Sequence, residues 1–443
     1  MVSLEELAES VERGDLDTVI VAFTDMQGRL VGKRLQGDYF LEEVRAGHPI
    51  EGPGYLVALG MEADHGNGHG VRPPSPEGGD LRMVADFTTL RRIPWLEGTA
   101  LVLADVAWQD GSPVLTSPRH MLRAQVERAR ALGFEPMFGS ELEFYVVKES
   151  YAEAEASHYR QLTPSSPHLL DYNVLAASSD EPFVRTVRTR MRAAGIEIEN
   201  TRDGASPGQH RISFRFTDAL SMADNHAIYK NGIKEIANQH KCSVTFMAKP
   251  EDSWIGSSCH VHSSLWQGDW NAFDGENNVF RQYLAGNIHC AADFGLFLAP
   301  TVNSYKRFTG GVGAPLLAWS YENGSCGFGA ADHGYGRCAE NRIPAADANP
   351  YLAFAATLAA GLYGIERGLE VPPAAQGNGH VASAQRFPQT LRDAISVMER
   401  SVVARHIFGE EVVDHYLNNA RNEQLLSDRV VTEYERTRLF ERV

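Results

Sequence analysis

The sequence is poor in cysteine and has no excess of basic residues. Five cysteines occur among 443 residues, without a CxxC pair, at Cys242, Cys259, Cys290, Cys326 and Cys338. We therefore expect a reduced, cytoplasmic protein rather than a disulfide-stabilised secreted one. The net charge of −16 argues against a nucleic-acid partner and against an anionic membrane, because both require a concentrated basic face. Apolar runs of membrane-spanning length are also missing, and the acidic start VSLEELAESVERG does not read as a signal peptide.

The composition and the order of the apolar segments indicate a globular protein with more than one domain. Hydrophobic residues make up 43% of the chain and charged residues 22%, and the length allows two or three domains. Residues 17–34 predict two strands around a turn, and residues 96–106 predict a buried strand. Ser117 then opens a helix, after which strand-like and helix-like segments alternate. We expect a small β-rich N-terminal domain and a larger α/β domain, divided near residue 110.

A long irregular segment, residues 46–82, holds many of the glycines and prolines and contains His65 and His69. Segments of this kind are usually functional or mobile. A metal-binding role for the two histidines is one interpretation, and an exposed polar loop is the one that we favour.

Two carboxylates interrupt an apolar strand-like run in GSELEFYVV, residues 139–147. Side chains alternate between the faces of a strand, so Glu141 and Glu143 point to one side. This pair is either the solvent-facing side of an amphipathic strand or the beginning of a metal site, and a metal site requires partners from elsewhere in the chain.

Two further segments repeat this alternate spacing of polar groups. His260 and His262 share one face of the strand-like CHVHSSLW, and Glu340 and Arg342 have the same spacing in ENRIP. A histidine on an apolar strand is usually a hydrogen-bonded core residue, but three such pairs in one domain favour a shared site. Carboxylate and imidazole ligands suit Mg²⁺, Mn²⁺, Zn²⁺ or Fe²⁺ and do not choose among them.

Several blocks of the chain resemble the signature segments of the glutamine synthetase family. These blocks are FTDMQGRLVGKR, GSELEF, GSSCHVHSSLW, NSYKRF and ENRIPAADANPYLAFAATLAAGLYGIE, and they are similar above all to the γ-glutamyl-polyamine and γ-glutamyl-ethanolamide synthetase branch. The resemblance implies an α+β fold, with a β-grasp domain over residues 1–108 and a catalytic α/β domain with a funnel-shaped antiparallel sheet over residues 109–443. It also implies a homo-oligomer of two stacked hexameric rings.

The resemblance implies a two-step reaction in which ATP phosphorylates the γ-carboxylate of glutamate and an amine displaces the phosphate, with two divalent metals neutralising charge. It assigns roles to seven positions. The ligands of one metal are Glu141, His260 and Glu340; the substrate carboxylates bind Arg307 and Arg342; nucleotide-side positions are His262 and Ser264.

The second metal site of the family is not matched. Glu143 fits its first ligand position, but the two acids that should follow align with Gly204 and Arg211. A guanidinium cannot ligate a cation. We therefore predict that only one divalent metal is bound, and that Arg211 pairs with Glu143 near the place of the second cation.

Residues that bind the phosphates in the family are also replaced. Two arginine positions read Gly324 and Gly329, and a third reads Cys338, beside Arg337. Gly313 stands where the glutamine-forming members carry a catalytic acid. We therefore expect ATP use to be lost or altered.

The main interpretation is a divergent metalloenzyme that acts on a small amino acid or amine at a single-metal site, its ancestral ligase chemistry lost or altered. Candidates for a catalytic acid, base or ligand are His210, Arg211, Cys259 and Cys338. The alternative is an ATP-dependent γ-glutamyl-amide ligase with an unusual amine in specialised metabolism. A second alternative is a non-catalytic scaffold or sensor.

Overall fold

A computed structural model describes residues 1–58, 60, 79–167, 172, 174–275, 278–309, 315–321, 326–333, 336–375 and 385–443. Four residues singled out above, His65, His69, Gly313 and Gly324, lie outside these ranges. In the part of the chain described, no helix is long and apolar enough to cross a membrane.

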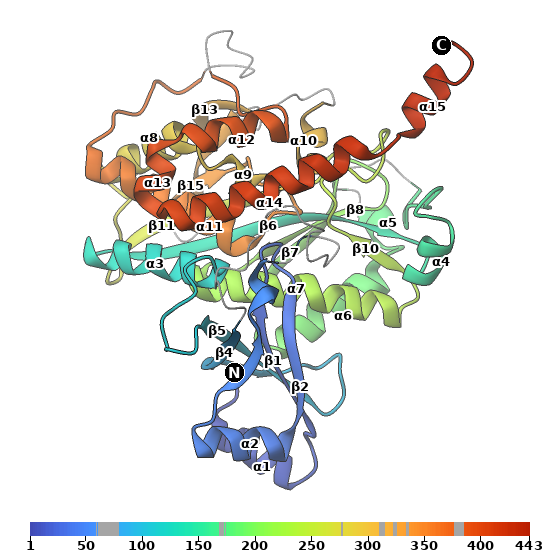
Figure 1. Ribbon diagram of the computed structural model, residues 1–443, viewed down its shortest axis with the longest axis vertical. Helices are drawn as coiled ribbons and strands as arrows, with labels where there is room; N and C mark the ends of the chain where they lie inside the picture. Colours follow the sequence, from blue (N-terminus) through green and yellow to red (C-terminus); the bar gives the residue numbers. More distant parts are fainter. Residues whose placement is uncertain are drawn as a thin grey trace.

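The N-terminal part of the chain forms a five-stranded sheet at one end of the molecule (Figure 1). The strand order is β2-β1-β5-β4-β3; β1 runs parallel to β5, and the other neighbours are antiparallel. The strands are β1 (Thr18–Thr24), β2 (Leu30–Gln36), β3 (Ile50–Pro53), β4 (Asp80–Arg92) and β5 (Thr99–Ala107), and two helices accompany them, α1 (Leu4–Glu12) and α2 (Gly37–Ala46). A separate apolar cluster fills this part, from Leu7 to Val114.

A second, larger sheet carries the polar pairs that the sequence analysis singled out. Its main path has the order β13-β14-β15-β11-β6-β8-β7, antiparallel except between β13 and β14. The strands are β6 (Glu135–Val147), β7 (Ile198–Asp203), β8 (Gln209–Phe214), β11 (Cys259–Gln267), β13 (Leu316–Tyr321), β14 (Cys326–His333) and β15 (Gly336–Asn341). Short strands β9 (Thr217–Asp218), β10 (Ser243–Thr245) and β12 (Trp270–Asn271) pair at its margins.

Helices pack around this sheet and form the main core (Figure 1). The long ones are α3 (Pro118–Ala131), α6 (Glu181–Ala193), α7 (Ala219–Gln239), α8 (Val279–Cys290), α11 (Pro350–Arg367), α12 (Leu391–Arg400) and α14 (Glu410–Arg429); shorter ones are α4 (Tyr151–Ala156), α5 (Val174–Ala177), α9 (Gly295–Leu298), α10 (Val302–Lys306), α13 (Val402–Phe408) and α15 (Glu433–Leu439). Helix α11 is buried on almost all sides, because its Ala- and Leu-rich sequence offers small apolar groups in every direction.

The predicted mixture of helices and sheets is confirmed, and most predicted elements lie within a few residues of their expected bounds. Two details differ. VTFMAK contributes only its first two residues to the three-residue β10, and Arg342 lies just after the end of β15 rather than inside the strand.

Candidate active site

Strand β6 lies between β11 and β8, and this order brings the polar pairs together. In the ladders Glu141 is paired with His260, and Glu143 with Arg211. His262 on β11 is in turn paired with Glu340 on β15. The three segments that the spacing singled out therefore meet on one sheet.

Glu141, His260 and Glu340 converge as a candidate metal-binding group. The Nδ1 atom of His260 lies 2.9 Å from Glu340 Oε1 and 3.7 Å from Glu141 Oε2. This nitrogen is buried and has no hydrogen-bond partner of acceptable geometry among the described residues. A cation shared by this nitrogen and the two carboxylates would give all three groups a common partner.

Two arginines occupy the outer oxygens of these carboxylates. Arg211 Nη1 donates to Glu141 Oε2 at 2.8 Å, and Arg342 forms an ion pair with Glu340 Oε2. Within the residues described, no three His, Cys, Asp or Glu side chains already enclose a cation position. The remaining oxygen of Glu340, Oε1, faces His260, whereas the remaining oxygen of Glu141, Oε1, faces His262 Nε2 at 3.7 Å. The three side chains are therefore a candidate ligand set by their chemistry and proximity.

The surroundings favour the charged forms of both carboxylates. Burial alone raises the pKa of Glu141, but hydrogen bonding to His262 and the positive charge of His262 and Arg211 outweigh burial and lower it to about 2. The pKa of Glu340 is likewise held far below its usual range, since His260 and Arg342 outweigh the effect of burial. Both groups are thus anionic ligands at neutral pH.

Glu143, by contrast, is closed off by partners from its own chain. Arg211 donates to its Oε1 through Nε, at 3.2 Å, and through Nη2. Ser258 donates to its Oε2 through the backbone N–H at 2.7 Å and the hydroxyl at 2.8 Å. The predicted pairing of Glu143 with Arg211 is present.

The position of Gly204 is filled as well. A Cβ atom placed on Gly204 would lie 2.6 Å from Oε1 of Gln209, so the Gln209 side chain takes the space of an acidic residue there. Gln209 donates through Nε2 to the Gly256 carbonyl and to Ser257 Oγ, at 3.2 Å each. The residues around Glu143 therefore do not fit a second divalent cation.

A cavity of about 320 Å³ opens beside Glu141. Its lining includes His262, Ser264 and Cys338, three of the positions predicted to belong to the site. The Sγ atom of Cys338 lies 3.8 Å from Nδ1 of His262, and Trp266 donates to the Ser264 hydroxyl at 2.8 Å. Burial lowers the pKa of His262, but Cys338 and the nearby glutamates outweigh it and raise that pKa to about 10.

The two arginines expected to bind substrate carboxylates have different surroundings. Arg307 donates to the Ile343 carbonyl, while its buried Nε lacks a partner among the described residues. Burial lowers the pKa of Arg307 to about 10, so it stays cationic at neutral pH. Arg342 lies over Gly329, where an added Cβ would meet its Nη2 at 2.8 Å. The glycine therefore leaves room for this guanidinium.

Two of the candidate catalytic residues point elsewhere. His210 is paired with Phe144 in the β6–β8 ladder, stacks on its ring, and bonds Asp180 at 2.8 Å on the face opposite Arg211. Cys259 is buried, and burial raises the pKa of its thiol to about 12. The structure brings neither residue into the cluster around Glu141.

Ser258 and Gln209 are site residues that the sequence reasoning missed. Gln209 has the alternate spacing to Arg211 that marks one strand face, and the same rule that grouped Glu141 with Glu143 would have found it. Ser258 precedes the β11 strand, and its contact with Glu143 depends on strand pairing, for which the sequence gives no local signal.

A carboxylate–imidazole cluster beside an open cavity is typical of enzymes that use a divalent cation. Residues 115–439 match the family model described as "Glutamine synthetase, catalytic domain", and the chain belongs to the glutamine synthetase family. It is therefore a member of a ligase family whose enzymes use divalent metals and ATP.

Two curated relatives match this chain over almost its whole length. A protein named gamma-glutamylethanolamide synthetase GlnA4, from Streptomyces coelicolor, is 45% identical over 99% of this chain and 96% of its own length. The glutamate–isopropylamine ligase of a Pseudomonas species is 35% identical over 93% of this chain and 92% of its own length. These names support the ligase alternative and lend no support to the main interpretation, in which ligase chemistry and ATP use are lost.

Solved structures agree with this family assignment. The structure titled "Apo GmaS without ligand" has a TM-score of 0.85 and 25% identity, and covers 99% of this chain and 100% of that chain. The structure titled "GmaS/ADP complex-Conformation 1" has the same TM-score, with 26% identity over 98% of this chain and 99% of that chain.

Proposed function

We propose that this protein is an ATP-dependent ligase that joins the γ-carboxylate of glutamate to a small primary amine. The observation that carries the proposal is the 45% identity, along 99% of the chain, to a gamma-glutamylethanolamide synthetase. The relative named as a glutamate–isopropylamine ligase supports the same class of acceptor. The amine itself distinguishes these relatives from one another, so the proposal is of a substrate class.

The nucleotide is assigned to the cavity beside Glu141. Its volume of about 320 Å³ lies within the range of small-ligand sites. His262 and Ser264 line it, and a GmaS structure of the same fold is titled as an ADP complex. Cys338 and Arg337 line the same cavity, so Arg337 supplies a positive charge next to the position of the missing family arginine.

One divalent cation is assigned to Glu141, His260 and Glu340. When bound, such a cation neutralises phosphate oxygens during phosphoryl transfer. Arg211 holds a fixed positive charge against Glu143 and Glu141, where the family places a second cation. This guanidinium is available for electrostatic stabilisation without a metal-binding step.

Glutamate is assigned to Arg307 and Arg342. The unpartnered Nε of Arg307 is a donor for a carboxylate oxygen, and a guanidinium can bind a carboxylate through two parallel hydrogen bonds. The two arginines thereby orient the γ-carboxylate toward the phosphate, which is the main task of the protein in this reaction class.

The wider organisation is proposed on the same basis. Residues 1–108 are assigned to a β-grasp domain, which the order β2-β1-β5-β4-β3 with parallel β1 and β5 supports, and residues 109–443 to the catalytic domain. We further propose a homo-oligomer of stacked hexameric rings. We also propose that it is located in the cytoplasm, because a reducing compartment keeps the five free cysteines in the thiol form.

The test is an ADP-release assay with glutamate and a panel of ethanolamine, isopropylamine and ammonia. We expect ADP release that requires both glutamate and an organic amine, with a γ-glutamyl amide identified by mass spectrometry. ADP release that occurs with glutamate and ammonia but with neither organic amine would identify a glutamine-forming enzyme. Absence of ATP binding by calorimetry would overturn the ligase proposal.

A further inference from the structure

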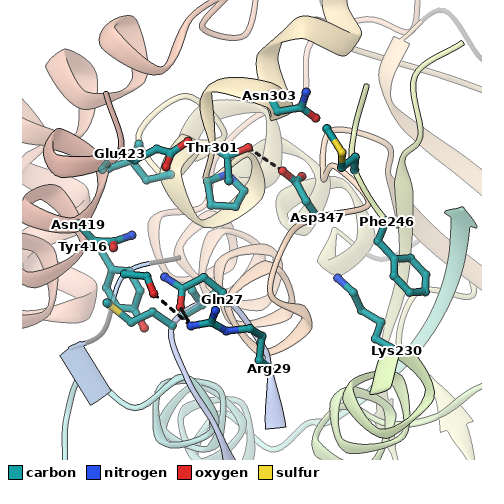
Figure 2. A pocket seen from close by; sticks show the side chains of 18 of the residues that line it. Gln27, Arg29, Lys230, Phe246, Thr301, Asn303, Asp347, Tyr416, Asn419 and Glu423 are labelled. Atoms are coloured by element: carbon teal, nitrogen blue, oxygen red, sulfur yellow. Dashed lines mark hydrogen bonds between the residues drawn. The ribbon is translucent and has the colours of Figure 1, made fainter. Parts of the chain in front are cut away.

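A second, larger cavity of about 490 Å³ lies apart from the candidate active site (Figure 2). It is bounded by the turn between β1 and β2, by helix α7, by the segment before α10 and by helix α14. Within the part of the chain that the structure describes, the residues that line this cavity differ from those that line the one beside Glu141. We call it the interdomain cavity, because it lies between the N-terminal sheet and the helices of the larger part.

One wall of the interdomain cavity is cationic. Lys230 and Lys234, one turn apart on α7, lie over the ring of Phe246 at 5.1 and 5.7 Å. Arg29, which is ion-paired with Asp25 at 2.6 Å, lines the same cavity (Figure 2). Among the described residues, Lys230 Nζ donates to the backbone carbonyls of Ala346 and Ala348, at 2.9 and 3.3 Å. Burial and the charge of Lys234 lower the pKa of Lys230 to about 8, and the attraction of Asp347 offsets only part of this effect.

The opposite wall is anionic. Asp347 Oδ2 accepts from the hydroxyls of Thr301 and Ser304, each at 2.8 Å. Its Oδ1 is buried and has no hydrogen-bond partner among the residues that the structure describes. Glu423 of α14, whose Oε1 accepts from the Val302 N–H at 3.3 Å, lines the cavity beyond Thr301, farther from Lys230 than Asp347 (Figure 2). A buried carboxylate oxygen without a donor is costly and is satisfied when a ligand supplies one.

We infer that the interdomain cavity binds a zwitterionic amino acid, with its carboxylate at Lys230 and Lys234 and its ammonium at Asp347 and Glu423. A simple anion would leave Asp347 Oδ1 without a hydrogen-bond donor, and a simple amine would add positive charge to a cavity that already holds Lys230 and Lys234. The volume lies within the range of small-ligand sites, and the ring of Phe246 offers an apolar surface for a side chain.

The cavity is connected to the proposed glutamate site through its wall. The Thr301–Asp347 hydrogen bond ties the start of α10, which leads into Arg307, to the segment that follows Arg342. A ligand that binds Asp347 therefore shifts the backbone segments that position Arg307 and Arg342. We expect its binding to change the KM for glutamate more than the kcat.

The test is calorimetric titration of the full-length protein with L-alanine, without ATP or amine, so its outcome does not depend on the ligation reaction. Acetate carries only the carboxylate of an amino acid, and ethylammonium carries only its ammonium group. Each should bind at least about tenfold more weakly than alanine, because each can pair with the charged residues of one wall only. Asp347→Asn and Lys234→Gln should each weaken alanine binding about tenfold or more, since a charged partner is lost. Glu423→Gln is a second anionic-wall variant, with a side chain of the same shape.

The matched control is Arg307→Lys, which alters the proposed glutamate site and should leave alanine binding unchanged. Thermal unfolding shows whether each variant is folded. Alanine binding that is lost in Arg307→Lys but kept in Asp347→Asn and Lys234→Gln would place the ligand in the active site and overturn the inference. Absence of alanine binding to the wild-type protein would overturn it as well.

Discussion

Glu141 and Glu143 lie two residues apart on the same face of β6, yet their surroundings differ. Glu141 faces His260, His262 and an open cavity, and only one of its oxygens is taken by an arginine. Glu143 receives four hydrogen bonds, from Arg211 and Ser258, and its side chain is 13% exposed. Glu141 keeps one oxygen without an arginine partner, whereas Glu143 is paired with a cation that belongs to the chain itself.

In the proposed function, this difference corresponds to a family site in which a guanidinium stands in place of one of the two metals. A metal must be taken from solution, whereas Arg211 is always present and always charged. Its position is fixed by two glutamates, so it is preorganised for negative charge that develops nearby. The Gln209 side chain fills the space beside Gly204, so an acidic side chain at position 204 requires that Gln209 move.

The largest expected effect separates the two glutamates directly. Glu141→Gln should abolish binding of Mn²⁺ and lower kcat/KM about 1000-fold, because a cation ligand is lost at the phosphoryl-transfer site. Glu143→Gln should keep about one Mn²⁺ per chain. Equilibrium dialysis with Mn²⁺ measures both. Two Mn²⁺ per wild-type chain, one of them lost in Glu143→Gln, would contradict the single-metal assignment.

The next largest effect concerns the built-in cation. Arg211→Met should lower the free energy of unfolding by about 3 kcal/mol, because it leaves the partly buried Glu143 without its counter-ion. Arg211→Lys keeps a positive charge and should recover part of this loss. Denaturant unfolding measures both.

The control for Arg211 is Arg215→Met. Arg215 pairs with Glu197 at 2.7 Å, but both side chains are more than half exposed. Removing this pair should change the free energy of unfolding by less than about 1 kcal/mol. Equal changes in the free energy of unfolding for Arg211→Met and Arg215→Met would show that the Arg211–Glu143 pair stabilises the fold no more than an exposed ion pair.

The fold was largely predictable from the sequence because the signals are local. Alternation located β6, β8 and β11, and Ser117 with Pro118 marked the start of α3. The same rule places His210 and Arg211 on opposite faces of one strand. Alternation along the strand therefore excludes His210 from the face that carries Arg211. VTFMAK had strand propensity but pairs only over β10, because pairing depends on a distant partner.

The state of the candidate site was less predictable, because it depends on contacts across the sheet. Sequence alignment with the family located Gly204 and Arg211, but the space taken by Gln209 and the Ser258 donors become visible only in three dimensions. The interdomain cavity is an extreme case. Arg29 and Glu423 lie almost 400 residues apart in the chain and line one space. No local pattern marks either residue.

A third prediction extends the comparison to a buried group that lacks a charged partner. His415 on α14 is 8% exposed, and burial lowers its pKa to about 4. Since this folded-state pKa is below the unfolded value of about 6.5, its contribution to stability is fully present above pH 6.5 and is lost as the pH falls toward 4. The loss should reach about 2 kcal/mol at pH 5.

Denaturant unfolding between pH 7 and pH 4.5 tests this prediction. His415→Gln should flatten the acid side of the profile, because the titrating group is removed. His120, whose pKa burial also lowers, serves as the comparison, and His120→Gln should have the smaller effect because that side chain is less buried. An unchanged profile in His415→Gln would show that other groups govern the acid loss.

The smallest expected effect lies at the glycine that makes room for Arg342. A Cβ at position 329 would lie 2.7 Å from Glu340 Oε2 and 2.8 Å from Arg342 Nη2. Both atoms are ends of flexible side chains, so Gly329→Ala should fold normally and displace the guanidinium by a fraction of an ångström. Binding energy from an Arg–carboxylate pair is sensitive to such a shift, and we expect the KM for glutamate to rise about threefold to tenfold with little change in kcat.

Gly14→Ala, at a position where nothing lies near the added Cβ, controls for the loss of a glycine, although its φ of +74° adds backbone strain of its own. If Gly329→Ala lowers Mn²⁺ affinity and leaves the KM for glutamate unchanged, the crowded partner is Glu340, and Arg342 then serves the cation site rather than the substrate.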